Sequence, residues 1–496
     1  MRRAKIVATF GPAIASYENT LAVLEAGVNV ARMNMSHGDY TVHQNTYDNV
    51  RKAAASLNKP VAIMADLQGP KIRLGRFANG EGYDLAVGDV FTITTEDVPG
   101  TKDICSTTLK SLTEDVNVGD IMLIDDGKVS VQATAVDSVK VVTIVTVPGK
   151  VSNNKGINLP GVAVNVPALS EKDEDDLRWA LACGADLIAL SFVRDAADIT
   201  RVHEIMDEAG RRVPVIAKIE KPQAVANLEA IVDAFDAIMV ARGDLGVELP
   251  LEDVPLVQKK CVEMARRWAK PVIVATQVLE SMIDNPRPTR AEASDCANAV
   301  LDGADAVMLS GETSVGKFPI ETVKVMARII EAAEEEAGMK LIPKLGSEPK
   351  TRGGVITAAA VQIADQLDAK FIATFTQSGD SARRLSRLRP KKQVFAFTPE
   401  VQVRNELALT WGIEPVLVPT VAHTDAMTEQ VDHTLLAKGL VEEGDLVVIA
   451  AGSPPGQAGS TNLVKVHKVG DLADLGKSES GVRINKEKIG PWPTEG

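Results

Sequence analysis

One pattern recurs along much of the chain: a short, almost continuous apolar run followed by a stretch with helical periodicity. Eight such runs have the length and composition of buried β-strands, and they cover residues 4–10, 28–33, 61–65, 187–192, 214–218, 237–241, 271–275 and 306–309. Apolar strands that alternate with helices form parallel sheets covered on both faces. The pattern therefore predicts an α/β fold, and the number of strands favours a TIM (β/α)8 barrel over an open doubly wound sheet.

A long interval between the third and fourth runs breaks this pattern. It is rich in turns and in valine, and its residues 88–95 and 139–146 alternate in character, which predicts an inserted β-domain over residues 71–165. We expect this insertion to be a β-barrel that hangs over the active face of the main barrel as a lid. The TIM barrel would then comprise residues 1–70 and 166–345.

Beyond a linker-like segment, strand and helix patterns alternate again. The expected strands are residues 371–375, 394–397, 415–418 and 446–450. These strands predict a C-terminal α/β domain over residues 346–470. The charged, Gly- and Pro-punctuated residues 471–496 are expected to form a tail.

The composition of the chain argues against several classes of function and indicates the cellular compartment. The formal net charge is −13 over 496 residues, which argues against a general nucleic-acid or anionic-membrane binder. No apolar run approaches the roughly 20 residues of a membrane helix, and the N-terminal apolar stretch is too short for a secretory signal. The four cysteines are scattered and the six histidines lack metal-ligand spacing, so a cytoplasmic protein without disulfides or a zinc site is expected.

Charged side chains follow two neighbouring predicted strands. Lys218 and Glu220 end the first, and Arg242 and Asp244 end the second. In a barrel these ends converge on one face, where the two carboxylates suit magnesium and the two cations suit a phosphoryl group. A solvated salt bridge and a strand-to-helix turn capped by Asp244 are the plainer alternatives.

Other predicted strands also end in polar residues. Arg32, Asn34 and Ser36 alternate with apolar residues, so they share one face that could hold a phosphate and a cation, or form an amphipathic strand edge. The hydroxyl of Thr276 could hold a substrate carboxylate or relay a proton, although a strand-end hydroxyl satisfied by the backbone is more common.

The connections to the two added domains offer further candidates. Arg73 and Lys155 stand at the outgoing and return hinges of the insertion, where they could reach a phosphate and a nucleotide or remain solvated. In the C-terminal domain, a strand-to-helix connection contains hydroxyls and a glycine, which suit a phosphate or an ordinary helix N-cap. These residues are Thr376, Ser378, Gly379 and Ser381.

Taken together, residues 1–470 resemble pyruvate kinase. The most specific segments are Ala217-Lys-Ile-Glu220, Val240-Ala-Arg-Gly-Asp-Leu-Gly-Val-Glu248, Ala275-Thr-Gln-Val-Leu-Glu-Ser-Met282 and Met308-Leu-Ser-Gly-Glu-Thr313. The resemblance implies phosphoryl transfer from phosphoenolpyruvate to ADP, which gives pyruvate and ATP. It also implies a barrel, an inserted β-domain and a C-terminal effector domain.

The resemblance assigns roles to individual residues. Lys218 would stabilise the transferring phosphoryl group, and Glu220 and Asp244 would bind magnesium, with a second magnesium arriving with ADP. Gly243, Asp244 and Thr276 would hold the substrate carboxylate, and Thr276 would aid protonation of the enolate. Phosphate contacts would come from Arg32 and Arg73. Nucleotide contacts would come from Asn34, Met35, Ser36, His37, Arg73 and Lys155.

Two departures refine the resemblance. Potassium-dependent relatives place a glutamate where this chain has Lys71 and a threonine-type residue where it has Leu67. The chain therefore resembles a bacterial, potassium-independent subgroup, in which the Lys71 ammonium would replace the ion at a site formed by Asn34, Ser36, Asp66 and Leu67. The loop at residues 452–459 lacks the basic and tryptophan residues of relatives regulated by fructose-1,6-bisphosphate. A monophosphate effector, such as AMP or a sugar phosphate, is therefore expected near Thr376, Ser378, Gly379 and Ser381.

Two other functions stay open at this point. A magnesium-dependent barrel lyase or aldolase acting on pyruvate enolate would also use a Glu/Asp pair and an arginine, but would not need Lys218 or a nucleotide-covering insertion. A non-catalytic regulatory or scaffold relative would keep the fold without turnover. The family further suggests a homotetramer.

Overall fold

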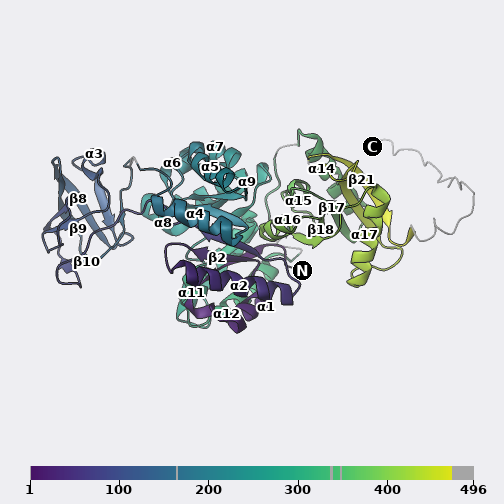
Figure 1. The fold of residues 1–496 in the computed structure, drawn as a ribbon, viewed down its shortest axis with the longest axis horizontal. Coiled ribbons are helices and arrows are strands. Elements are labelled where there is room, and N and C mark those ends of the chain that lie inside the picture. The colour runs from purple at the N-terminus through teal and green to yellow at the C-terminus, as the bar shows by residue number, and fades with distance from the viewer. Residues whose placement is uncertain (1, 163–165, 336–338, 347–348, 458, 472–496) are drawn as a thin grey trace, which may run out of the picture.

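The computed structural model describes residues 2–162, 166–335, 339–346, 349–457 and 459–471. The predicted tail lies outside the described residues from residue 472 on. Three bodies lie in a row, with the insertion at one end, the barrel in the middle and the C-terminal domain at the other end (Figure 1). No helix of the described part is long and apolar enough to cross a membrane.

Eight parallel strands close into the central barrel, as predicted, in the order β1-β16-β15-β14-β13-β12-β3-β2. Their bounds are β1 Lys5–Phe10, β2 Val30–Asn34, β3 Ala62–Asp66, β12 Leu187–Leu190, β13 Val215–Ile219, β14 Ala237–Ala241, β15 Val272–Ala275 and β16 Ala306–Leu309. The predicted TIM barrel is confirmed, and the open doubly wound sheet is excluded because β1 pairs with both β2 and β16.

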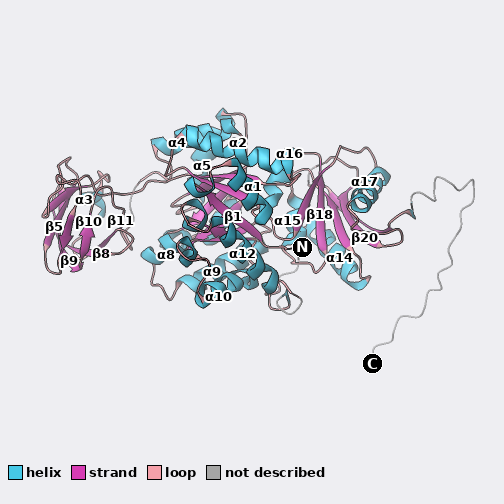
Figure 2. Ribbon diagram, turned by 90° about the horizontal axis from the view of Figure 1, so that it is seen from below, coloured by secondary structure: helices cyan, strands magenta, loops and turns pink. Residues whose placement is uncertain are grey.

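Helices surround these strands (Figure 2). The longer ones are α1 Tyr17–Ala26, α2 Tyr40–Ser56, α4 Glu171–Cys183, α5 Ile199–Glu208, α7 Leu228–Ala234, α9 Val254–Arg267, α10 Arg290–Asp302 and α12 Pro319–Ala333. Local sequence sets their ends: the side chain of Ser170 caps α4 in a capping box with Asp173, and Gly184 ends that helix at a φ of 98°.

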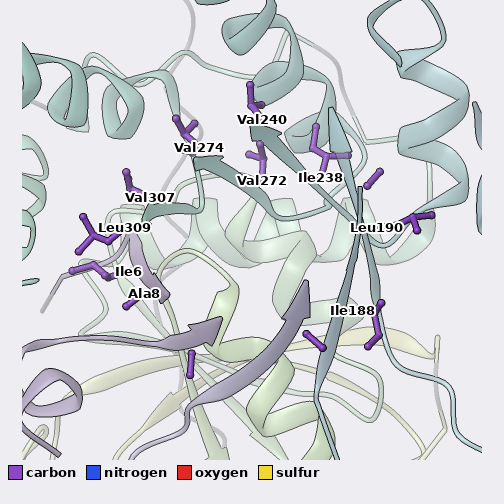
Figure 3. Close-up of a cluster of buried hydrophobic side chains, with 14 of the residues drawn as sticks. Ile6, Ala8, Ile188, Leu190, Ile238, Val240, Val272, Val274, Val307 and Leu309 are labelled. Carbon is purple, nitrogen blue, oxygen red and sulfur yellow. The ribbon is translucent and has the colours of Figure 1, made fainter. Parts of the chain in front are cut away.

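Strand alternation sorts the barrel side chains into two cores. Ile6, Ala8 and Val240 belong to the core between strands and helices (Figure 3), whereas Val7 and Met239 fill the barrel interior. Because side chains alternate with a period of two, the polar residues in register with Val7 and its counterparts on the other strands also face the interior.

The insertion contains short strands, as expected. They are β4 Tyr83–Leu85, β5 Val90–Thr94, β6 Ile104–Ser106, β7 Ile121–Ile124, β8 Val129–Val136, β9 Lys140–Val147, β10 Gly149–Val151 and β11 Ile157–Asn158. In the described residues they form a six-stranded sheet and a separate pair, rather than the single closed β-barrel expected, because β4 and β10 pair only with each other. The boundaries at residues 71 and 165 stay a prediction.

The C-terminal domain has a five-stranded sheet in the order β19-β18-β17-β20-β21. Its strands are β17 Phe371–Phe375, β18 Gln393–Thr398, β19 Ile413–Leu417, β20 Leu446–Gly452 and β21 Thr461–Lys468. The last strand, which pairs antiparallel with β20, is absent from the sequence prediction, because it mixes lysine and histidine with apolar residues. The helices are α14 Arg352–Gln366, α15 Asp380–Ser386, α16 Val401–Glu406 and α17 Thr424–Ala437.

A short 3-10 turn of this domain packs against the barrel. The turn, η4 Leu407–Leu409, places Ala408 and Leu409 in the same buried cluster as the interior residues of the barrel strands. The C-terminal domain therefore packs against the amino ends of the strands, and the carboxyl ends remain for the site.

Candidate active site

Five polar side chains meet at the carboxyl ends of the barrel strands. Thr9, Arg32, Asp66, Ser191 and Lys218 are connected by hydrogen bonds and ion pairs. On four of their strands they continue the interior series, since Val7, Val30, Met64 and Ile216 line the interior two positions before Thr9, Arg32, Asp66 and Lys218. The period of the strands thus turns polar residues from distant parts of the sequence toward one another.

Asp66 lies between the two cations of this cluster. Its Oδ2 accepts a hydrogen bond from Nε of Arg32 at 2.7 Å, and its Oδ1 lies 3.3 Å from Nζ of Lys218. The Lys218 ammonium lies 2.9 Å from Oε1 of Glu220 and donates to Oγ of Ser191 at 2.7 Å. The guanidinium and the ammonium are therefore fixed on one side of the strand ends.

Burial and charge pairing set the protonation states of this cluster. Burial by itself would lower the pKa of Lys218, but the carboxylates of Asp66 and Glu220 outweigh it and raise that pKa. Burial would raise the pKa of Asp66, but Lys218 and Arg32 lower it. The site therefore keeps Lys218 as an ammonium and Asp66 as a carboxylate at neutral pH.

Glu220, like Asp66, has one carboxylate oxygen whose bonding capacity is only partly used. It is 1% exposed, and burial raises its pKa. Its Oε2 accepts from the backbone N–H of Phe192 at 2.7 Å, whereas Oε1 faces Lys218 without completing a hydrogen bond to any described residue. A buried carboxylate oxygen with spare capacity is suited to a cation.

Asp244 provides the second carboxylate near this position. It lies in the first turn of α8 Arg242–Glu248, it acts electrostatically on both Lys218 and Glu220, and no described residue pairs with it. No group of three or more His, Cys, Asp or Glu side chains in the described residues is arranged to hold a metal. Two carboxylates fit Mg²⁺, because that ion keeps waters and substrate oxygens in its remaining positions.

Thr276 adopts an unusual backbone at the end of β15. Its φ is +65°, and the φ of Gln277 is +55°; such values are uncommon for a β-branched residue and are concentrated at functional sites. Oγ1 of Thr276 accepts from the N–H of Gly243 at 2.7 Å, and Arg242 donates to the Thr276 carbonyl at 2.9 Å. Thr276 and the start of α8 thus form one unit.

The loop after β2 carries the predicted nucleotide residues. Met35 is buried and its N–H donates to the carbonyl of Asp66 at 3.0 Å, while Ser36 donates its N–H to Oδ1 of Asn34 at 3.1 Å. His37 is largely exposed. The buried part of its side chain, together with the charges of Lys71, Arg73 and Arg32, lowers its pKa. This loop therefore lies in a positive field beside the cluster of Asp66.

A cavity of about 260 Å³ lies between the insertion and the barrel. The insertion contributes Arg73 and Lys155, and the barrel contributes Phe192, Lys221 and Asp244. Arg73 donates to the carbonyl of Asn154 at 3.0 Å, and Lys155 pairs with Asp125 at 2.9 Å. The two hinge residues thus line one cleft with Asp244, but neither directly contacts the Arg32–Lys218 cluster.

The remaining predicted residues lie in two places. Leu67 is buried, with its carbonyl accepting from Ser191 at 2.7 Å, and Lys71 is exposed at the rim of the cavity. The effector candidates Thr376, Ser378 and Ser381 line a small pocket of about 50 Å³ at the end of β17. There the N–H of Gly379, whose φ is +80°, donates to Oγ1 of Thr376 at 2.9 Å.

Family models match both large domains. The barrel-domain model of pyruvate kinase matches residues 1–323, and the alpha/beta-domain model of pyruvate kinase matches residues 355–467. The chain belongs to the pyruvate kinase family.

Individual relatives agree with this assignment. The chain is 58% identical over 470 residues to a pyruvate kinase of Mycobacterium intracellulare, an alignment that covers 95% of this chain and 99% of the relative. It is 57% identical over 470 residues to a pyruvate kinase of Mycobacterium tuberculosis, with the same coverage. Among solved structures, a pyruvate kinase from Cryptosporidium parvum matches with a TM-score of 0.87 and 35% identity, covering 94% of this chain and 96% of that chain. The chain is therefore a phosphotransferase of this family.

Sequence reasoning missed several residues of this pyruvate kinase site. Ser191 lies within the predicted strand over residues 187–192, and it accepts a hydrogen bond from Lys218. Phe192 has a φ of +56° and donates its N–H to Glu220, while Lys221 pairs with Glu248 at 2.6 Å. The polar end of β12 was a usable signal for Ser191. No signal in the sequence shows that Phe192 and Glu248 come close to Glu220 and Lys221.

Proposed function

We propose that this pyruvate kinase transfers the phosphoryl group of phosphoenolpyruvate to ADP, giving pyruvate and ATP. One observation carries the proposal: the Lys218 ammonium lies 2.9 Å from Glu220, beside a cleft that Asp244 shares with Arg73 and Lys155 of the insertion. This arrangement offers positive charge and metal-binding oxygens to a phosphoryl group, with a nucleotide-covering domain above it.

Lys218 and Arg32 would neutralise the oxygens of the phosphoryl group during transfer. Both cations are held by Asp66, so little reorganisation is needed when substrate binds. Glu220 and Asp244 would hold Mg²⁺, which supplies charge neutralisation to the substrate oxygens when it is bound, and a second Mg²⁺ would arrive with ADP. The spare Oε1 of Glu220 supports this assignment.

The start of α8 and Thr276 would hold the substrate carboxylate. The Gly243 N–H already donates to Oγ1 of Thr276, so a carboxylate could take over this donor and the hydroxyl. During transfer, the bond from phosphorus to the enol oxygen breaks and a bond to a β-phosphate oxygen of ADP forms. The enolate carbon then takes a proton from water, and the Thr276 hydroxyl would position and relay it.

Asn34, Met35, Ser36, His37, Arg73 and Lys155 would contact the nucleotide. The pKa of His37 is lowered first by burial and then by the positive charges of Lys71, Arg73 and Arg32, and these charges support a polyphosphate at this place. Exclusion of water by the insertion would favour transfer to ADP over hydrolysis.

Potassium would not be required. The Lys71 ammonium has no carboxylate within ion-pair distance among the described residues, which leaves it available to serve a site formed by Asn34, Ser36, Asp66 and Leu67. Its positive charge acts on the neighbouring His37, which supports its closeness to that loop.

The finer biological expectations follow the family. A phosphorylated effector would bind the pocket lined by the hydroxyls of Thr376, Ser378 and Ser381, next to Gly379 at the N-terminal end of α15. The enzyme would act as a homotetramer in the cytoplasm, at the pyruvate-forming step of glycolysis.

A substrate-omission assay tests the proposal. ATP and pyruvate should form in equal amounts only when phosphoenolpyruvate, ADP and Mg²⁺ are all present. Formation of pyruvate without ADP would instead support the barrel lyase or aldolase. No turnover, even with Mg²⁺ and a panel of phosphorylated effectors, would support the non-catalytic relative.

A further inference from the structure

A buried carboxylate joins the insertion to the barrel at the edge of the active-site cleft. Glu248 is the last residue of α8, and its side chain is 2% exposed. Its Oε1 accepts from Nδ2 of Asn158 at 3.0 Å and pairs with Nζ of Lys221 at 2.6 Å. One oxygen therefore holds a donor from the insertion and a cation from the barrel.

Each partner of Glu248 adjoins a part of the proposed machinery. Lys221 follows Glu220, and its ammonium lies 5.5 Å from the ring centroid of Phe192, whose N–H holds Glu220. Glu248 ends the seven-residue helix that begins at Arg242 and carries Asp244 in its first turn. Both proposed magnesium ligands are thus connected to Glu248 through short, well-packed segments.

Asn158 brings the insertion into the same network. It lies in β11, next to Ile157, whose N–H donates to the carbonyl of Ile72 at 2.9 Å. The N–H of Leu74 donates to the carbonyl of Lys155 at 2.8 Å, so the outgoing and return hinge segments form a ladder around Arg73. Fixing Asn158 consequently fixes the two hinge segments that carry Lys155 and Arg73.

We propose that Glu248 is a positioning residue that locks the hinge of the insertion to the magnesium-binding end of the barrel. The carboxylate sets the distance between the nucleotide-contacting residues of the insertion and the carboxylates of the barrel. This inference rests on the proposed function, because it assigns Arg73 and Lys155 to the nucleotide. It predicts that breaking the contact impairs ADP more than phosphoenolpyruvate.

Two substitutions separate the arms of the junction. Asn158→Ala removes the arm to the insertion and leaves the Lys221–Glu248 pair intact, whereas Glu248→Gln removes the charge that holds Lys221. We expect Asn158→Ala to raise the KM for ADP by about 5- to 30-fold, the effect of losing one or two well-placed interactions, with the KM for phosphoenolpyruvate changing less than about 3-fold. Asn158→Asp should be more severe, because a second carboxylate then faces Glu248.

Hydrogen–deuterium exchange of the free full-length enzyme provides a readout independent of turnover. Exchange at residues 154–159 and 244–249 should increase together in Asn158→Ala and Glu248→Gln, and the double variant should add little to Glu248→Gln. Asn117→Ala, at an exposed asparagine of the insertion away from the hinge, is the matched control and should change neither readout.

Two results would overturn the inference. One is increased exchange at residues 154–159 alone in Asn158→Ala and Glu248→Gln. The other is an equal rise in the KM values for ADP and phosphoenolpyruvate in Asn158→Ala. In both cases the wild-type enzyme would still form ATP from the two substrates. Failure of the proposed function would appear differently, as absence of that reaction in the wild type.

Discussion

The two ends of the barrel each contain a buried ion pair, and the pairs differ in how completely their oxygens are used. At the amino end, Asp305 accepts through Oδ1 from the N–H of Trp411 and through Oδ2 from the N–H of Val272, both at 3.1 Å. Arg389 bonds both oxygens as well. At the carboxyl end, Glu220 Oε1 and Asp66 Oδ1 face Lys218 without completing hydrogen bonds to described residues.

This difference separates an ion pair that joins two domains from an ion pair that we propose acts in phosphoryl transfer. Asp305 and Arg389 form an ion pair between the barrel and the C-terminal domain. Both oxygens of Asp305 already accept hydrogen bonds, so they have no spare capacity for a ligand. The carboxyl end opens to a cleft and keeps a partly exposed ammonium beside a carboxylate with spare capacity. The two ends have similar residue types but differ in how many hydrogen bonds their carboxylate oxygens accept. Substitutions at both ends test whether this difference separates function from stability.

The largest effect is expected at Lys218. Lys218→Met should lower kcat by about 10³-fold, because the phosphoryl oxygens lose a preorganised cation. A coupled pyruvate assay measures this loss. Lys324→Met, at an exposed lysine of α12, is the control and should leave kcat unchanged; a loss of less than tenfold for Lys218→Met would contradict the charge-stabilising role.

Glu220 should combine a large catalytic effect with no loss of stability. Glu220→Gln should lower kcat by about 10²-fold, while the melting temperature stays equal or rises. Burial raises the pKa of Glu220, so the folded protein holds its proton more tightly than the unfolded chain does. Its ionised form therefore costs stability at neutral pH, and the amide removes that cost. Calorimetry measures the melting temperatures. The exposed Glu229→Gln control should keep both the wild-type melting temperature and the wild-type kcat.

Asp305 should show the opposite combination. Asp305→Asn leaves Arg389 buried without its counter-charge, and we expect the free energy of unfolding to fall by about 3–5 kcal/mol. The folded variant should retain kcat within about twofold, because the ion pair lies at the far end of the strands. Denaturant titration and steady-state assay of the same sample check both parts, with the exposed Asp365→Asn as control. A large fall in kcat with unchanged stability would reverse the comparison.

A smaller, pH-dependent effect is expected at Glu406, near the amino end. Burial raises the pKa of Glu406 to about 7 from 4.5, although Gln402 and Arg383 act in the opposite direction, and Asp186 and Asp236 add to the rise. Its stabilising contribution is present at acidic pH and is lost as pH rises through about 7.

The free energy of unfolding of the wild type should therefore fall between pH 5 and pH 8 by about 1–2 kcal/mol more than that of Glu406→Gln. The melting temperature of the wild type should show the same steeper decline. The exposed Glu429→Gln should retain the wild-type slope. Parallel slopes for wild type and Glu406→Gln would refute the assignment.

The smallest effect concerns potassium. The activity of the wild type should change by less than about twofold between potassium-free and potassium-containing buffer, because the Lys71 ammonium would take the place of the ion. Lys71→Glu should make the enzyme dependent on potassium, which would supply the missing positive charge. A strong dependence in the wild type would show that Lys71 does not replace the ion.

Much of this molecule could be predicted from local pattern. The eight apolar runs give the barrel strands within a few residues, and the residue types at positions 218, 220 and 244 indicate a metal and a phosphoryl group. The strand prediction succeeds because strand period is a local property, while the metal and the phosphoryl group stay predictions. Strand β21 was missed because charge interrupts its apolar pattern.

The sequence by itself determined which side chains occur at the strand ends and on which face of each strand they lie. Only the tertiary structure decided that Ser191 bonds Lys218, that Asp66 holds two cations, and that Asn158 of the insertion meets Glu248. Such contacts depend on the register of distant strands and on the packing of separate domains. No local periodicity encodes these distances, because they arise only when the barrel closes.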